Sequence, residues 1–261
     1  MFRLASRLAF NITLTNNHHH IAIVLLISLC CSSCASVYVS SVRNTPLLTK
    51  KGEFQGSASF GNGANLNAAY ALTNHIGITA GGMYSNNSLV NWKNTYRKHQ
   101  SAEVALGYFT NKDRISFETY IGYGGGHGYA QDSLFGLFIF SNTQQTAEGT
   151  YHRYFIQPTF AFSPSRVLFA LTMRISYIEF KDLLVMRDNA NPLYLRNRAS
   201  YVLEPSFTTK FFVSRRPTSL YVFAQAGFNI TEQSDDVRYN MPVIVPHWNL
   251  GMGIRLLKED D

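Results

Sequence analysis

The sequence predicts an all-β protein: an antiparallel up-and-down transmembrane β-barrel of about ten strands, with eight strands as the alternative. Three features of the chain lead to this prediction. Apolar and polar residues alternate with period two through most of its length, as they do in half-buried strands. The connections between these segments are short and long in turn, as in outer-membrane barrels. The polar face of the segments mixes opposite charges with small residues, which suits an enclosed lumen.

The alternation is clearest near the C-terminus. Trp248, Leu250 and Met252 point to one side of a strand, and Asn249 and Gly251 point to the other. Ten segments share the pattern, and several have the ~9–11 residues that a tilted membrane strand needs. They cover residues 53–61, 64–73, 75–85, 98–109, 114–125, 150–162, 166–180, 200–212, 218–230 and 245–257.

Two prolines bear on the strand count. Pro158 and Pro205 fall inside strands, and a proline removes one donor from the ladder of a barrel that has no edge. We therefore expect local bulges at these residues or earlier strand ends, which is why eight strands remain the alternative.

The connections alternate in length along the chain. Residues 73–75, 110–113, 163–165 and 214–218 are short turns, and only 61–65 is a short connection on the other side. Outer-membrane barrels have short periplasmic turns and longer extracellular loops, so both ends of the barrel are expected in the periplasm. The long connections are then extracellular loops that could meet an external ligand or protein: 86–97, 126–149, 181–199 and 231–244.

The two faces of the strands favour a membrane barrel over a soluble sandwich. An exposed sandwich face usually carries many more charges, especially lysine, whereas a membrane barrel turns its apolar face to lipid and encloses the polar one. We expect membrane lipid around the barrel and a structural network of ion pairs and hydrogen bonds in a narrow lumen. Its charged members are Glu103, Glu118, Arg153, Arg174, Glu204, Lys210 and Arg255.

The N-terminus has the order of an export signal. Arg3 and Arg7 precede an apolar core at 21–29, which is too short to span a bilayer as a helix. Small residues and the chain's three cysteines, Cys30, Cys31 and Cys34, follow. This ending resembles a bacterial lipobox, with Cys34 as the lipidated residue and Cys31 as the alternative; a cysteine-rich signal peptide without lipidation is the other interpretation. The predicted division is a lipoprotein signal peptide at 1–33, a periplasmic tether at 34–52 and the barrel at 53–261.

The stretches "CASVYV", "RNTPLLTKKGEFQGSASFG" and "NLNAAYALTNHIGITAGG" occur in this order. Together they resemble small outer-membrane β-barrel lipoproteins of Bacteroidota over about residues 30–85. The resemblance implies a barrel with a lipid anchor and says almost nothing about activity. The residues after Cys34 lack the acidic tract that resembles a surface-export signal in such lipoproteins, which favours an anchor in the periplasmic leaflet of the outer membrane.

The sequence gives little support for nucleic-acid binding, for a cofactor or metal site, or for hydrolysis. The net charge of +7 is scattered along the chain, so a nucleic-acid partner is not expected. No cofactor is predicted, because "GYGGGHGY" (122–129) lacks the phosphate-binding residues. No metal site is predicted either, because the cysteine cluster has no further Cys or His at coordinating spacing. His127, His152 and His247 could serve as a general base in a barrel acyl hydrolase, but no serine is placed opposite any of them.

The predicted function is therefore that of an outer-membrane β-barrel lipoprotein with a structural or surface-binding role through its extracellular loops, and not that of an enzyme. A narrow pore for ions or small solutes is the first alternative, and a membrane acyl hydrolase is the second. A soluble periplasmic β-sandwich lipoprotein is the alternative for the fold.

Overall fold

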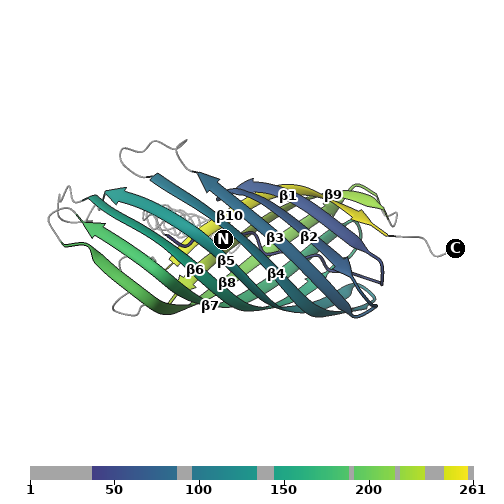
Figure 1. Cartoon of the computed structure of the whole chain (residues 1–261). Coiled ribbons are helices and arrows are strands. Elements are labelled where there is room, and N and C mark those ends of the chain that lie inside the picture. Colours follow the sequence, from purple (N-terminus) through teal and green to yellow (C-terminus); the bar gives the residue numbers. More distant parts are fainter. Residues whose placement is uncertain are drawn as a thin grey trace, which may run out of the picture. The chain divides into compact units, whose positions relative to one another are not determined.

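The described residues form one closed barrel of ten antiparallel strands (Figure 1). The computed structural model describes residues 37–86, 96–133, 144–187, 191–214, 218–232 and 244–257 of the chain. Within these ranges no helix is long and apolar enough to cross a membrane. The strands are β1 (Phe54–Gly61), β2 (Ala64–Ala71), β3 (Ile76–Asn86), β4 (Tyr96–Lys112), β5 (Ile115–Ser133), β6 (Gln144–Phe162), β7 (Val167–Arg187), β8 (Leu193–Phe212), β9 (Ser219–Thr231) and β10 (Ile244–Leu256).

Each strand pairs with its neighbours in the sequence, and β1 pairs with β10 to close the sheet. The closing register joins Phe54 to Leu256 and Gly61 to Asn249. The prediction of an up-and-down barrel with ten strands is thus confirmed. The sandwich alternative is wrong, because all ten strands belong to a single closed sheet.

The strands differ greatly in length. β1 and β2 have 8 residues each, whereas β5, β6, β7 and β8 have 19, 19, 21 and 20. All short connections lie at one end of the barrel, here called the turn end, apart from residues 62–63 between β1 and β2. The other end is called the loop end, and there β5–β8 project beyond the rest (Figure 1, left). Much of the predicted loops 126–149 and 181–199 is therefore strand.

The strands run through both prolines. Pro158 lies inside β6 and pairs with Thr119, and Pro205 lies inside β8 and pairs with Met173. The ladder is interrupted on the other side of each proline, but the register is the same before and after the gap. The predicted bulges and early strand ends are wrong, since neighbouring ladder bonds on both sides hold the strand straight. The register shift in β6 falls instead between Thr150 and Tyr151.

The outer face is apolar around the whole barrel. Large hydrophobic side chains such as Leu66, Ile121 and Met252 are each 68% exposed, which no water-facing surface of this extent would tolerate. On β5–β8 four directly paired tyrosines form a row across this face toward the loop side: Tyr123, Tyr154, Tyr177 and Tyr201. Beyond the row, charged residues such as Asp182 and Arg196 are exposed together with apolar ones such as Met186. Tyrosines at such a border are typical of a membrane interface. The fold is that of an outer-membrane β-barrel.

We expect Gly107→Ala to destabilise the barrel. A Cβ at this position would lie 2.3 Å from the backbone oxygen of Thr119 and 2.3 Å from the Tyr120 ring. Such overpacking costs about 1–3 kcal/mol. Gly82→Ala is the matched control, because its Cβ would meet only the oxygen of Ser101, at 3.7 Å. Folded and unfolded forms separate on unheated gels after incubation in increasing urea; equal midpoints for the two variants would contradict the packing described here.

Candidate functional site in the barrel lumen

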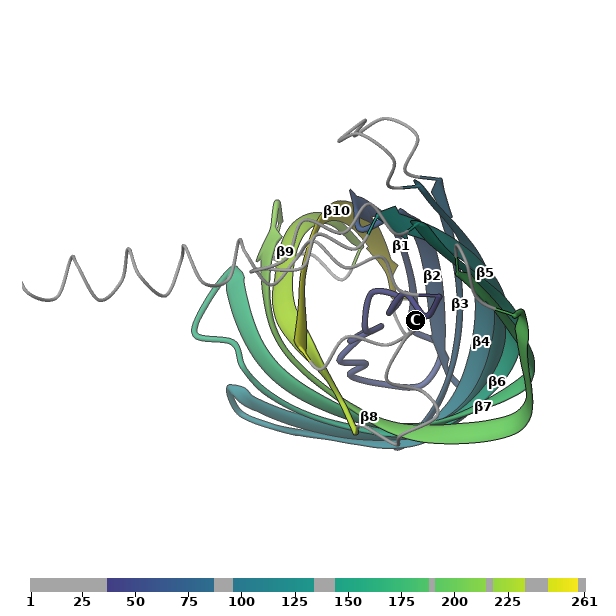
Figure 2. The ribbon, with the colours of Figure 1, turned by 90° about the vertical axis from the view of Figure 1, so that its left-hand side faces the viewer.

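The lumen is occupied by the chain itself. Residues 37–53 run inside the ring of strands (Figure 2, purple), and their contacts lead from the loop end to the turn end. At the loop end, the carbonyl oxygen of Val37 would lie 2.0 Å from a Cβ on Gly128 of β5, so this close approach requires glycine. At the turn end, Asn111 of β4 donates its Nδ2 to the Leu48 oxygen at 2.8 Å. We call residues 37–53 the lumen segment.

This position differs from the periplasmic tether predicted for residues 34–52. Every residue from Val37 to Leu48 except Asn44 is buried. The composition of the stretch explains why: it holds a single charged residue, Arg43, and many apolar or small side chains. A chain of that kind buries its surface when a matching cavity is available, whereas a solvated linker is usually polar.

Glu204 of β8 is the main carboxylate that holds the lumen segment. It accepts hydrogen bonds from the Tyr38 hydroxyl at 2.5 Å and from the Ser40 hydroxyl at 3.0 Å. It also forms an ion pair with Arg43 at 3.2 Å, and both side chains of this pair are fully buried. Three residues of the segment therefore converge on one carboxylate of the wall.

Arg43 makes further bonds to the opposite side of the barrel. Its Nη2 donates to Asn229 of β9 at 2.8 Å, and its Nη1 lies 2.6 Å from Nε2 of His247 on β10. The Arg43 backbone is held at both polar atoms by Gln225 of β9, at 3.0 and 3.1 Å. This one residue links β8, β9 and β10 through the centre of the lumen.

Glu103 of β4 is the second carboxylate at this level. It pairs with Arg153 of β6 and with Arg174 of β7, the latter at 3.1 Å. The Ser41 hydroxyl of the lumen segment lies within 3.3 Å of both guanidinium groups and donates to Glu103 at 3.2 Å. Tyr38 accepts a further bond from Arg153 at 2.7 Å. The wall and the segment thus share a single hydrogen-bonded network.

A second group of charges surrounds the segment near the turn end. Glu118 of β5 accepts a bond from the Leu47 backbone at 2.8 Å, and Lys210 of β8 donates to the Thr45 oxygen at 2.6 Å. Leu47 has a φ of +54°, a left-handed conformation that is unusual for leucine. Arg255 of β10 is half-buried, with its guanidinium 4.8 Å from the Phe212 ring. All seven residues of the predicted lumen network thus point inward.

Apolar side chains fill the space between the charged groups. Val37 and Tyr38 belong to a buried cluster in the loop-end half of the barrel, together with Tyr151, Phe180 and Leu195. Val42 and Leu47 belong to another cluster with residues of β6–β9. A cavity beside Arg43 and Lys210 has a volume of about 10 Å³, which holds about one water molecule. Here the lumen is closed by packing as well as by polar bonds.

The histidines of the hydrolase alternative do not form one site. His127 and His152 face outward on β5 and β6, where they contact Glu148 and Tyr123 respectively. His247 is buried in the lumen beside Arg43. Glu103 and Glu118 lie far apart on the lumen wall: Glu118 is paired with Phe109, six residues along β4 from Glu103, or about 20 Å. Among the described residues, no group of acidic, histidine or cysteine side chains could hold a metal ion.

Sequence reasoning did not find the residues of the lumen segment that complete the network. Tyr38, Ser40, Ser41 and Arg43 lie outside any alternating pattern, so nothing assigned them to the barrel. The signal that could have found them is the low charge of the stretch, which a solvated tether would not show.

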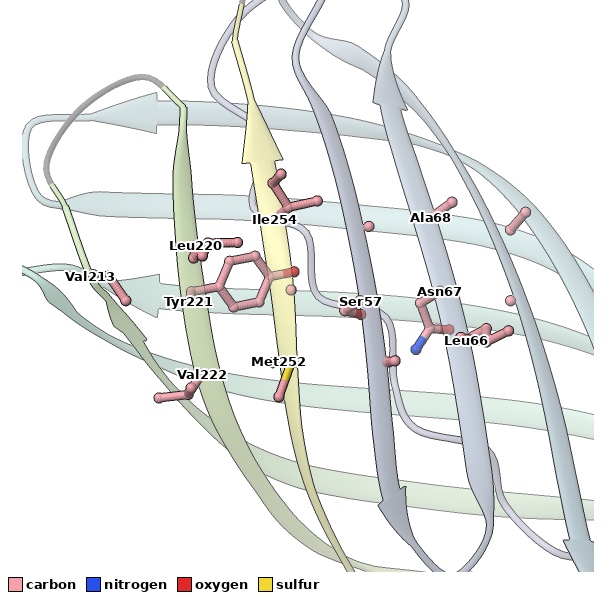
Figure 3. Close-up of a pocket in the computed structure, with 15 residues that line it drawn as sticks. Ser57, Leu66, Asn67, Ala68, Val213, Leu220, Tyr221, Val222, Met252 and Ile254 are labelled. Atoms are coloured by element: carbon pink, nitrogen blue, oxygen red, sulfur yellow. The ribbon is translucent and has the colours of Figure 1, made fainter.

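A hollow also lies on the outer face. It has a volume of about 860 Å³ and is lined mainly by apolar and small residues of β1, β2, β9 and β10. Figure 3 shows Leu220, Met252 and Leu66 around it, on three different strands. Gly56 and Ala68 are directly paired at its floor, where their small size leaves the space open. The hollow faces outward among lipid-facing side chains.

Solved structures resemble this chain in fold. The outer membrane protease OmpT from Escherichia coli is 10% identical, with 83% of this chain and 99% of that chain covered and a TM-score of 0.47. The translocator domain of the autotransporter NalP from Neisseria meningitidis is 10% identical, with 78% and 85% covered and a TM-score of 0.42. A FadL homologue from Pseudomonas aeruginosa is 7% identical, with 78% and 87% covered and a TM-score of 0.27.

No protein-family model and no curated protein matches the chain. The outer-membrane β-barrel fold is supported, and the resemblance to Bacteroidota lipoproteins stays a prediction. The prediction that the chain is not an enzyme is wrong in light of these comparisons, because a protease is among the barrels that resemble it. At 10% identity the likeness shows the fold alone, and it assigns no activity to this chain.

Arg43→Met is expected to destabilise the barrel strongly. It leaves Glu204 buried without its nearest cation, and removing one partner of a buried ion pair typically costs about 3–5 kcal/mol. Lys51→Met is the matched control, since Lys51 lies in the same segment but is exposed. Urea unfolding in detergent micelles measures both. A loss for Arg43→Met no larger than that of the control would show that the ion pair does not hold the segment.

Proposed function

We propose that this protein is a lipid-modified outer-membrane barrel with a closed lumen, and that it binds an external ligand or protein through the surface that β5–β8 raise above the membrane. The observation that carries the proposal is the loop-end extension of these four strands, which has an apolar core of its own. Lipidation at Cys34 is supported by the lipobox-like sequence, and this residue lies outside the described part of the chain.

The filled lumen argues against the pore alternative. Eight strands enclose a space that side chains just fill, and channels are typical of 16–18 strands. In this ten-stranded barrel the extra room is taken by the lumen segment, which contacts side chains of β2, β4–β8, β9 and β10. A solute would have to displace Arg43 from its buried partners in order to pass.

The extension has the properties of a binding surface. Beyond the tyrosine row its inner face is packed by Ile178, Phe180, Leu183 and Val185, which supports the strands from inside. Its outer face carries exposed residues of both charges, such as Asp182 and Arg196. Tyr194 is 72% exposed on β8. Tyrosine and arginine are the residue types that most often dominate binding interfaces.

The closed lumen predicts that the purified protein does not conduct ions in planar bilayers. A variant in which residues 37–48 are replaced by a Gly/Ser stretch of equal length should show discrete channel openings, because its lumen loses the packed segment. The gel shift between heated and unheated samples verifies that the variant has folded. Steady conductance of the wild-type protein would refute the closed barrel and restore the pore alternative.

The binding role predicts that Tyr194→Ser with Arg196→Ser weakens binding to the protein's surface ligand at least tenfold. Purified wild-type protein is first screened on arrays of bacterial and animal glycans and of extracellular peptides, and the variant is then compared on every positive probe. The control is Leu220→Ser with Phe211→Ser, two outward residues near the turn end. If no probe distinguishes the two variants, the extension is not the binding surface.

A further inference from the structure

We infer that the chain enters the barrel from the loop end, so that the residues preceding Val37 lie on the extracellular side of the outer membrane. If Cys34 carries a lipid, as the proposed function has it, that lipid belongs to the outer leaflet rather than to the periplasmic leaflet expected from the sequence. The inference rests on the direction of the lumen segment, and it holds with or without the lipid.

The direction of the segment is fixed by its contacts at successive heights. Val37 lies against Gly128 of β5, Leu47 is bonded to Glu118 on the same strand, and Gly52 is bonded to Ala71 at the turn end. β5 begins at the turn end with Ile115. The segment therefore descends along β5 as its residue numbers rise, and it joins β1 at the periplasmic side.

The chain between each cysteine and Val37 is too short for the cysteine to lie at the periplasmic end of the barrel. Gly128 lies 13 residues beyond Ile115 on β5, which is about 43 Å along the strand and about 33 Å in height at the usual tilt. Cys34 is three residues before Val37, and three extended residues span at most ~11 Å. Cys31 is six residues away and could cover at most ~22 Å. Neither cysteine reaches the periplasmic face.

The tyrosine row places Val37 relative to the membrane. Tyr123 ends the apolar outer face of β5, and Gly128 lies five residues farther toward the loop end, about 12 Å higher. The outward positions in between are Gly125 and His127, and the His127 side chain pairs with Glu148 in a polar surrounding. Val37 is therefore at a level where the outside of β5 and β6 is polar.

The barrel wall is low at β1 and β2, which leaves a path from the lumen to the outer leaflet. β1 and β2 end far below the tips of β5–β8 at the loop side. The backbone of Val42 is bonded to Asn65, the second residue of β2, at 3.1 Å. The segment before Val42 consequently stands above the short wall of β1 and β2. A chain that leaves over this wall meets the outer leaflet directly.

The test places an epitope tag, flanked by glycine and serine, between Ala35 and Ser36 of the full chain. Antibody binding to intact cells is compared with binding to permeabilised cells. The same tag after Asn191 marks the loop end, and the tag after Ser165 marks the turn end. The tag at Ser36 should be detected on intact cells as strongly as the one at Asn191; detection only after permeabilisation, as for Ser165, would overturn the inference.

Two further measurements keep the result decisive. The gel shift shows whether the tagged barrel has folded; if it has not, Ser36→Cys is labelled with a membrane-impermeant maleimide, with Asn191→Cys and Lys112→Cys as references. Labelling of Ser36→Cys only after permeabilisation contradicts the inference. Loss of radiolabelled palmitate in Cys34→Ala tests the lipid separately. If the tag is detected on intact cells but the protein carries no palmitate, lipidation at Cys34 is refuted, whereas the entry of the chain from the loop end is still supported.

Discussion

The structure depends on the compensation of charges inside a closed barrel. Glu103 and Glu204 face a lumen from which water is largely excluded, and an unpaired carboxylate in such a place costs several kcal/mol. Arg153 and Arg174 of the wall both bind Glu103, and Arg43 of the lumen segment binds Glu204. The hydroxyl groups of Tyr38 and Ser40 donate to Glu204, and that of Ser41 donates to Glu103. The wall alone would leave Glu204 with only Arg174 at 3.9 Å and Ser176 at 3.5 Å, so the segment is part of the barrel's folded state.

The shape of the wall agrees with this electrostatic requirement. A Cβ on Gly77 would lie 2.6 Å from the Leu48 side chain, and one on Gly128 would lie 2.0 Å from the Val37 carbonyl. Glycine at both levels lets the segment approach the backbone of the sheet. Steric fit at the two ends and ion pairing in the middle select the same path, and a shift of the segment along the lumen would break both.

The barrel itself could be predicted from the sequence because its signal is local. Period two in stretches such as 248–256, and the alternation of short and long connections, depend only on near neighbours in the chain. The inward charges Arg153 and Glu204 followed from that period. The lumen segment could not be predicted in this way, because its structure is set by contacts across the barrel, such as that of Arg43 with Glu204, which lies 161 positions later in the sequence. Strand tips such as 126–133 were missed for a related reason: glycines at 124–126 and 128 resemble a loop, yet here they line a sheet packed closely against Val37 and Tyr151.

The unequal height of the wall connects the interior to the surface. Val37 and Tyr38 do not only close the lumen; they belong to the same apolar cluster as Phe180, Leu183 and Leu195, which supports β7 and β8 above the membrane. Long strands with an empty interior would expose these apolar faces to water at the loop end. The short strands β1 and β2 have no such faces to cover, and there the wall is low. The segment that blocks passage through the barrel therefore also provides the core on which the extracellular surface is built, so that in this fold a closed lumen and a raised surface are consequences of one packing arrangement.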